Sequence, residues 1–310
     1  MRNFGVRVQD WLSRIRSDQH LDRNKPSPER TVFILLGGAA RGAAQAGVLT
    51  VLFEQGITPD AIVGISAGAW NGAYLALAPS QDRCMALEGL WIATTSQEVM
   101  SPHRWAIALN AVTNRPALFG NEGMRRMAER HLKGATFEDA RIRLSIVASD
   151  LASGNAYVFE TGSLVQAIMA SSAVPGIFPP VIQDDVFLVD GGLSEWASCE
   201  KAMELGATRV VLVACGGVQS NMERPEGLRL ILQQSFEFAN RMSFRQTVAA
   251  MRGLGLDVLP IYPELHAGTA LNFDVAPALV HAGRIAATRA IREWRDAHDS
   301  PRMVNDSMSR

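Results

Sequence analysis

Apolar residues along this chain form short runs that alternate with longer segments in which apolar positions recur at helical spacing. The short runs, rich in Val, Ile, Leu and Phe, are typical of strands buried on both faces of a sheet. They predict strands at 31–36, 61–65, 142–148, 155–160, 186–189, 209–214 and 256–261. The helical spacing predicts helices at 43–55, 67–77, 81–95, 121–132, 163–171, 197–205, 226–252 and 276–297. This alternation indicates an α/β fold with a mostly parallel central sheet covered by helices on both faces.

The two ends of the chain differ from this pattern. Residues 1–30 combine a helix, in which apolar positions are interspersed with arginines, with a polar linker that contains two prolines. Such a helix docks on its own domain or lies at the surface of an anionic membrane, and both interpretations stay open. A chain of 310 residues can bury one large core, so we expect a single domain at 31–300 and a tail at 301–310.

Segment 64–68, which reads Gly-Ile-Ser-Ala-Gly, has the pattern of a nucleophile elbow. It follows an apolar strand and precedes a run of small residues that can continue as a helix. In such a turn the serine is pushed clear of the backbone, and small neighbours let strand and helix approach each other. Ser66 is therefore a candidate nucleophile, with Gly64 and Gly68 as its small flanking residues.

A second unit of strand, loop and helix lies upstream, where segment 37–42 reads Gly-Gly-Ala-Ala-Arg-Gly. Backbone N–H groups at the start of a helix suit an anion or a developing oxyanion. A Walker loop would need Gly-Lys-Ser/Thr where Arg41 and Gly42 stand, and a dinucleotide fingerprint would need glycine at position 39. The loop therefore favours an oxyanion site over nucleotide binding.

A carboxylate and two glycines, Asp190, Gly191 and Gly192, follow the strand expected at 186–189. Ligands bind at the carboxyl ends of the strands in an open parallel sheet, so we expect this aspartate to converge with the elbow and the glycine-rich loop. An Asp-Gly pair that merely caps a turn is the alternative. The presence of the two other motifs favours the site.

In this order, the glycine-rich loop, the Gly-x-Ser-x-Gly segment and the Asp-Gly-Gly segment resemble the three signature motifs of the patatin-like phospholipase family. Segments 46–49 (Ala-Gly-Val-Leu) and 171–180 (Ser-Ser-Ala-Val-Pro-Gly-Ile-Phe-Pro-Pro) are similar to two further blocks of that family. The resemblance spans residues 31–215. It implies a patatin-like three-layer architecture, in which 31–300 would be the catalytic domain.

The resemblance implies a serine acyl hydrolase that works with a Ser–Asp dyad and needs no cofactor. Ser66 would be the nucleophile and Asp190 the base, and the backbone N–H groups of Gly37, Gly38 and Ala39 would form the oxyanion hole. A carboxylate with its ordinary pKa is a poor base towards a hydroxyl, so Asp190 needs partial burial and direct hydrogen-bond reach to Ser66. The implied substrate is an ester of an acyl lipid: a phospholipid, a lysophospholipid or a neutral glyceride.

Further residues support the motifs, namely Arg41, Gly42, Gly64, Gly68, Gly191 and Gly192. Arg41 would hold the loop or attract a lipid phosphate, unless it is a surface arginine paired with a carboxylate. Two features depart from the family pattern. Ala39 stands where the family has glycine and tolerates a positive φ poorly, which bears on the rate more than on the reaction class. Segment 194–198 replaces asparagine and proline residues, and its Trp196 would either wall the acyl site or be an ordinary half-buried aromatic.

Two other functions stay open on the sequence. An α/β-hydrolase triad could recruit His266 or His281 after Asp190, but Ser66 follows the second expected strand, whereas that fold places its elbow later. A patatin-like shell that binds lipid without turnover is the second alternative. The presence of both Ser66 and Asp190 argues against it.

Charge, cysteine content and motif searches exclude several other classes. The formal net charge of −1 shows no basic bias, so nucleic acid is not expected as a partner. Cys84, Cys199 and Cys215 are scattered, so neither a disulfide framework nor a zinc site is indicated, and Cys215 is a weak candidate nucleophile. No calcium-loop or His-Glu-x-x-His pattern occurs, so we expect no metal.

Membrane signals are also absent from the sequence. No run of about eighteen apolar residues occurs, and the N-terminal segment lacks the apolar core of a secretory signal. We therefore expect a cytoplasmic protein, with peripheral membrane contact and the oligomeric state left open. Segments 99–119 and 228–251 are apolar enough to form a lid over an acyl site, and core packing is the alternative for each.

Overall fold

The computed structural model of the chain describes residues 29–100, 117–218, 228–265 and 270–299. The helix expected within 1–30 and the tail at 301–310 lie outside the described residues, as does most of the segment 99–119. The division of the chain into a leading segment, a domain and a tail therefore stays a prediction.

The centre of the molecule is a mixed sheet. Its strands are β1 (Thr31–Leu35), β2 (Ala61–Ile65), β3 (Arg143–Asp150), β4 (Ala156–Phe159), β5 (Val181–Gln183), β6 (Val186–Asp190), β7 (Arg209–Val213) and β9 (Asp257–Ile261). Among the described residues, hydrogen-bonded pairs link these strands in the sequence β5-β6-β3-β2-β1-β7-β9, and β4 also pairs with β3. The pairs among β1, β2, β3, β7 and β9 are parallel, whereas β4, β5 and β6 pair in antiparallel fashion. A separate small pair joins β8 (Gly217–Val218) to β10 (Glu264–Leu265).

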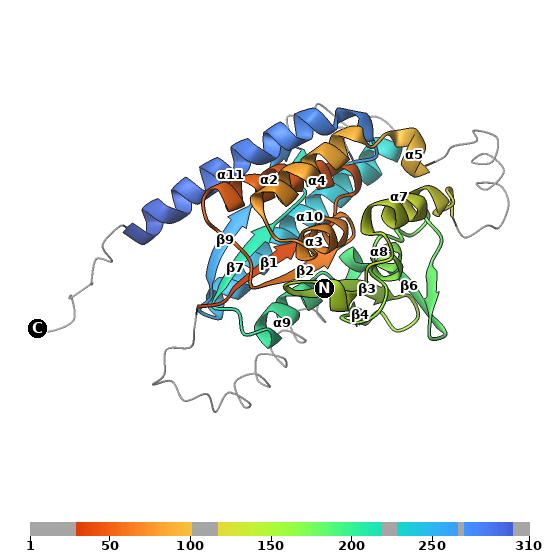
Figure 1. Cartoon of the computed structure of the whole chain (residues 1–310), viewed down its shortest axis with the longest axis horizontal. Coiled ribbons are helices and arrows are strands. Elements are labelled where there is room, and N and C mark those ends of the chain that lie inside the picture. The colour runs from red at the N-terminus through yellow and green to blue at the C-terminus, as the bar shows by residue number, and fades with distance from the viewer. Residues whose placement is uncertain (1–28, 101–116, 219–227, 266–269, 300–310) are drawn as a thin grey trace, which may run out of the picture.

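Helices cover both faces of this sheet. They are α2 (Gly42–Glu54), α3 (Ala67–Ala76), α4 (Gln81–Ala93), α5 (Ser96–Met100), α7 (Glu122–Leu132), α8 (Leu164–Ser171), α9 (Trp196–Glu204), α10 (Leu228–Gly253) and α11 (Ala276–Asp299). Helices α2, α4 and α11 lie on one side of the strands and α9 lies on the other (Figure 1). The described buried residues of α10 pack with those of α9.

Alternating residues within each strand supply two separate cores. In β1, Phe33 and Leu35 pack with α2, α3, α4, α8 and α11, whereas Val32 and Ile34 pack with α9 and α10. Every residue of this strand is buried, as expected of a central strand with helices on both faces. The α/β class and the mostly parallel, doubly covered sheet are thus confirmed.

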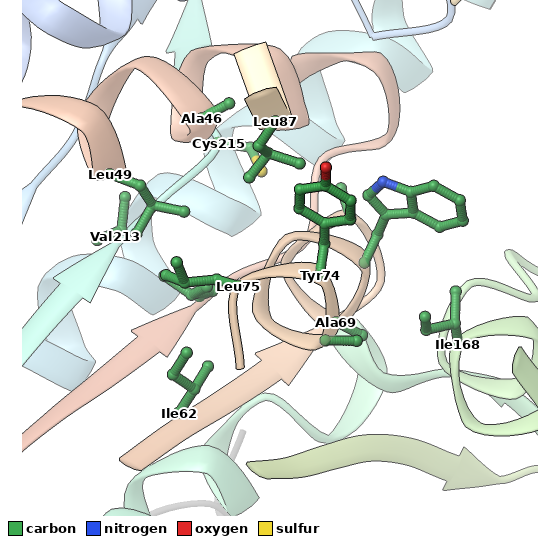
Figure 2. Packing of buried hydrophobic residues seen from close by; sticks show 14 of the residues in the cluster. Ala46, Leu49, Ile62, Ala69, Tyr74, Leu75, Leu87, Ile168, Val213 and Cys215 are labelled. Carbon is green, nitrogen blue, oxygen red and sulfur yellow. The ribbon is translucent and has the colours of Figure 1, made fainter. Parts of the chain in front are cut away.

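The larger core fills the space between the sheet and the layer of α2 and α3 (Figure 2). Leu49 of α2, Leu75 of α3 and Ile62 of β2 lie in it and have no exposed surface. Burying an aliphatic side chain of this size contributes about 1.5 to 3 kcal/mol relative to leaving it exposed. This packing fixes α2 and α3, the two helices that follow the glycine-rich loop and the elbow.

The expected strands and helices agree with the observed ones to within two residues at each end. Side-chain caps explain two of the helix starts, because Ser80 accepts a hydrogen bond from the backbone N–H of Arg83, and Ser163 accepts one from Gln166. Among the described residues, the α-helix and strands that the pattern missed are α5, β5, β8 and β10, and four short 3-10 helices were also not expected. Each is too short to give a periodic signal.

Substitution of two helix glycines, Gly283 and Gly89, tests the packing of α11 against α2. A Cβ at Gly283 of α11 would overlap the carbonyl oxygen of Ala44 in α2, whereas a Cβ at Gly89 of α4 would meet nothing. We expect Gly283→Ala to lower the free energy of unfolding by about 1 to 3 kcal/mol through overpacking. Gly89→Ala should raise it by about 0.5 to 1 kcal/mol, because alanine is the better helix former. Urea unfolding measures both, and equal effects of the same sign would contradict this account of the helix contact.

Candidate active site

Ser66 occupies a strained turn between β2 and α3. Its backbone has φ 53° and ψ −120°, a left-handed conformation that is costly for a residue with a side chain. A Cβ at Gly68 would overlap the carbonyl oxygen of Leu35, and one at Gly64 would lie 2.6 Å from Cα of Ala69. Both flanking positions therefore require glycine, as the nucleophile-elbow pattern predicts.

Asp190 and Ser66 are brought together by strand β3, with which the strands that precede both residues pair. Ile65, the last residue of β2, pairs with Val147 of β3, and Asp190, the last residue of β6, pairs with Ala148. Val147 and Ala148 also pair with β4. Because a strand has only two edges, β4 occupies one edge of β3, and β2 and β6 share the other edge. Strands β2 and β6 thus run towards each other beside β3, and their carboxyl ends meet.

This geometry corrects one step of the sequence argument. The convergence of the elbow and the aspartate was expected because the carboxyl ends of parallel strands meet at one edge of a sheet. In the structure β6 is antiparallel to β3, and Asp190 comes to the elbow because β3 extends past the end of β2. The convergence was predicted correctly, but the reason given for it was wrong.

Burial and hydrogen bonds define the state of the Asp190 carboxyl group. Its Oδ1 accepts a hydrogen bond of 2.8 Å from the backbone N–H of Gly192. Burial raises the pKa of this carboxyl group from 3.8 to about 6, although the Gly192 N–H and the nearby Ser66 hydroxyl both act in the opposite direction. Asp190 is thus a stronger base than an exposed aspartate, and it lies beside Ser66.

Two buried serines, Ser171 and Ser149, hold the Ser66–Asp190 pair in place through hydrogen bonds to the backbone. The backbone N–H of Ser66 donates to Oγ of Ser171 at 2.8 Å, and that hydroxyl donates to the carbonyl of Val147 at 2.6 Å. Ser149 donates to the carbonyl of Asp190 at 3.0 Å. These anchoring roles were not predicted from the sequence, although Ser171 begins one of the segments that resemble family blocks.

The glycine-rich loop lies directly beside the elbow. A Cβ at Gly37 would lie 3.0 Å from Cβ of Ser66, and one at Gly38 would overlap the side chain of Cys215. Ala39 has φ 50°, so this alanine adopts the left-handed conformation that it was expected to tolerate poorly. Among the described residues, no hydrogen bond engages the backbone N–H groups of Gly37, Gly38 and Ala39.

The other motif residues have steric or polar reasons for their identity. Arg41 is only 4% exposed and donates to the carbonyl of Gly216 at 3.4 Å, so its interpretation as a surface arginine was wrong. A Cβ at Gly191 would overlap the carbonyl oxygen of Val147, and one at Gly42 would meet the ring of Trp91. Substituting either glycine would push apart elements that carry the site.

The structure also places the residues of three alternative interpretations: a histidine of a triad, a cysteine nucleophile and a tryptophan wall of the acyl site. His281 is exposed on α11, and His266 lies outside the described residues. Cys215 donates its thiol proton to the carbonyl of Leu36, and burial raises its pKa to about 12, which opposes formation of a nucleophilic thiolate. Trp196 is half-buried and packs against the core beneath α9 and α10, so the ordinary aromatic interpretation fits it.

The expected lid segments are only partly described. Val99 is buried in the main core, and residues 101–116 lie outside the described part of the chain. In α10, Phe244 and Met251 are buried against the sheet, whereas Phe238 is 67% exposed. One face of the carboxyl-terminal half of α10 therefore packs in the core, and a lid role for either segment stays a prediction.

The described residues contain neither a metal cluster nor a membrane-spanning helix. Within that part of the chain, no three His, Cys, Asp or Glu side chains gather where they could hold a metal ion. None of the helices described is both long and apolar enough to cross a membrane.

The fold and the site together define a three-layer α/β protein with a serine elbow, a buried aspartate and a glycine-rich loop at one point of the sheet. The model of the patatin-like phospholipases matches residues 33–197, which is more than half of the 310 residues. The chain therefore belongs to the patatin-like phospholipase family. Membership of this family supports hydrolase activity on lipids.

Individual relatives are distant. Patatin-like phospholipase domain-containing protein 6 of Mus musculus is 28% identical over 207 residues, which is 65% of this chain and 15% of that protein. An NTE family protein of Mycobacterium tuberculosis is 26% identical over 283 residues, 85% of this chain and 46% of that protein. The chain thus matches less than half the length of either relative.

Solved structures resemble this one at lower identity still. VipD from Legionella pneumophila aligns over 86% of this chain and 67% of its own, with a TM-score of 0.43 and 13% identity. The type III effector protein ExoU aligns over 86% of this chain and 54% of its own, with a TM-score of 0.38 and 13% identity.

Proposed function

We propose that this protein hydrolyses carboxylic esters of acyl lipids through a dyad of Ser66 and Asp190. One observation carries the proposal: the Ser66 hydroxyl lies beside a buried Asp190 carboxyl group whose pKa is raised to about 6 by burial. A nucleophile with a base beside it is the pair that acyl transfer requires. The family supplies the lipid class of the substrate.

In the first half of the reaction, Asp190 takes the proton of the Ser66 hydroxyl while Oγ attacks the ester carbonyl carbon. The carbonyl oxygen becomes an oxyanion, and the backbone N–H groups of Gly37, Gly38 and Ala39 donate to it. Such preorganised donors are worth about 3 to 4 kcal/mol of barrier each. The intermediate then collapses, the proton passes from Asp190 to the leaving alcohol oxygen, and the acyl group remains on Ser66.

In the second half, Asp190 takes a proton from a water molecule while the water oxygen attacks the acyl carbonyl. The second tetrahedral intermediate expels Oγ of Ser66, which regains its proton from Asp190. The products are a fatty acid and the free enzyme. The same carboxylate thus acts as base and acid in turn, which a pKa near the working pH favours.

The raised pKa of Asp190 predicts a pH profile for this reaction. The carboxylate is the active form, so kcat/KM should rise about tenfold per pH unit below pH 6 and level off above it. A titration with a p-nitrophenyl ester from pH 4.5 to 8 measures this. Glu195 is the matched control, because burial raises its pKa to about 7 and it lies outside the dyad. Glu195→Gln should keep the inflection near pH 6, and a profile that stays flat from pH 5 to 7 would contradict the assignment of the base.

The reaction class is tested by hydrolysis of p-nitrophenyl esters of graded acyl length, in the presence of EDTA. Turnover that survives chelation supports the proposal, and its optimum gives the acyl length that the site prefers. Phospholipid, lysophospholipid and diacylglycerol with that acyl chain then identify the head group. No turnover on any of these esters, from a folded protein, would favour the lipid-binding shell over the enzyme.

A further inference from the structure

Two side-chain amides lie within buried stretches of helix whose neighbouring residues are small or apolar. Gln45 of α2 and Asn71 of α3 have no exposed surface, and Trp91 of α4 is 5% exposed. Burying a side-chain amide is costly unless all of its polar atoms find partners. These amides therefore need an explanation that packing alone does not give.

The three side chains form one closed network. Trp91 Nε1 donates to Oδ1 of Asn71 at 2.7 Å, and Nδ2 of Asn71 donates to Oε1 of Gln45 at 2.9 Å. Nδ2 of Asn71 also donates to the carbonyl of Gly42 at 3.0 Å. Nε2 of Gln45 donates to the carbonyls of Val213 and Leu36, at 3.0 and 3.3 Å.

The backbone acceptors of this network bracket the glycine-rich loop. Leu36 immediately precedes Gly37, and Gly42 immediately follows the loop. The Gln45 amide therefore binds the backbone where the loop begins, and the Asn71 amide binds it where the loop ends. Asn71 belongs to α3, the helix that begins at the elbow. A single set of hydrogen bonds thus ties the loop to the helix that carries Ser66.

The indole of Trp91 is itself fixed in place. It stacks on Phe273 with ring centroids 6.2 Å apart and an interplanar angle of 8°. A Cβ at Gly42 would lie 2.6 Å from Cη2 of this ring, so the ring fills the space that this glycine leaves. The donor that orients the Asn71 amide is therefore held rigidly.

We propose that Gln45, Asn71 and Trp91 are positioning residues that set the distance between the glycine-rich loop and Ser66. The inference rests on the proposed function, in which the loop N–H groups stabilise the oxyanion. Displacement of such donors by about 1 Å costs roughly 100-fold in rate. The network acts through the backbone, since none of its three side chains bonds to Ser66 or Asp190.

The test uses the near-isosteric variants Gln45→Met and Asn71→Leu in the full chain. Active sites are titrated to completion with a fluorophosphonate, and kcat and KM for a p-nitrophenyl ester are expressed per titrated site. We expect kcat per site to fall about 10- to 100-fold while KM stays within about twofold. A merely structural role would lower the melting temperature or the number of sites and leave kcat per site unchanged.

Thr50→Val is the matched control, because Thr50 is a fully buried polar residue of the same helix whose hydroxyl donates to Ala46 within α2. It should leave kcat per site unchanged. The double variant Gln45→Met/Asn71→Leu should cost little more than either single variant, since both belong to one network. Independent, multiplicative losses would overturn the network as a unit.

If the amide variants do not fold, Trp91→Phe tests the positioning role of the network instead. This variant removes the N–H donor and keeps an aromatic ring. It should lower kcat per site about 3- to 10-fold. An unchanged kcat per site in the folded variants would overturn the inference. The proposed function fails separately, if Ser66→Ala retains wild-type turnover in the same assay.

Discussion

Ser66→Ala is expected to lower ester hydrolysis by at least about 10³-fold while leaving the fold intact. The serine hydroxyl is the nucleophile that forms the acyl-enzyme of the proposed reaction, and without it the remaining oxyanion donors give only residual catalysis. Ser66 is 5% exposed, and its backbone N–H bond to Ser171 does not depend on the side chain. The measurement is initial-rate hydrolysis of a p-nitrophenyl ester, with circular dichroism and the melting temperature as checks on folding.

Ser145→Ala provides the matched control for that variant. Ser145 is a fully buried serine of the neighbouring strand β3, and its hydroxyl donates to Glu160 at 2.9 Å, away from the elbow. We expect it to keep wild-type turnover. A folded Ser66→Ala protein with unchanged activity would remove the nucleophile from the account.

Asp190→Asn is expected to lower kcat by about 10² to 10⁴-fold and at the same time to stabilise the protein above pH 6. The amide keeps the shape of the carboxylate but cannot take the proton of Ser66. The stabilisation follows from the raised pKa. Between pH 3.8 and about 6 the folded state holds a proton that the unfolded state has released, so the free energy of unfolding falls as pH rises.

Removing that buried charge should raise the free energy of unfolding at pH 8 by about 1 to 3 kcal/mol. Urea unfolding of both proteins at pH 4 and pH 8 measures the effect, which should be largest at pH 8. His266→Ala and His281→Ala are the controls for activity. Loss of turnover in either histidine variant, together with a fully active Asp190→Asn, would favour an α/β-hydrolase triad.

Most of the fold could be predicted from the sequence because its strands are apolar on both faces. A run such as Thr31–Leu35 is apolar on both faces and rich in β-branched and aromatic residues, which favours a central strand covered on both sides. The direction of β6 could not be read in the same way. A short apolar strand looks the same in a parallel and in an antiparallel pair, and only the register with β3 distinguishes them.

The candidate site was predictable where local sequence dictates local geometry. A serine between two glycines after a strand predicts the turn at Ser66, and the contact of Gly64 with Ala69 is local, whereas Gly68 also makes room for the carbonyl oxygen of Leu35 in β1. The anchoring serine Ser171 and the amides Gln45 and Asn71 were not assigned, because their partners are distant along the chain. A signal was nevertheless available: a lone amide in a helix of alanine, glycine and apolar residues indicates a buried polar contact.

The most direct test of the central claim is to react the wild-type protein with a fluorophosphonate, digest it and map the adduct by mass spectrometry. The account predicts one stoichiometric adduct on the peptide that contains Ser66. It also predicts that labelling slows in Asp190→Asn and is absent in Ser66→Ala. An adduct on another residue, or a protein that hydrolyses esters without forming any adduct on Ser66, would contradict the account.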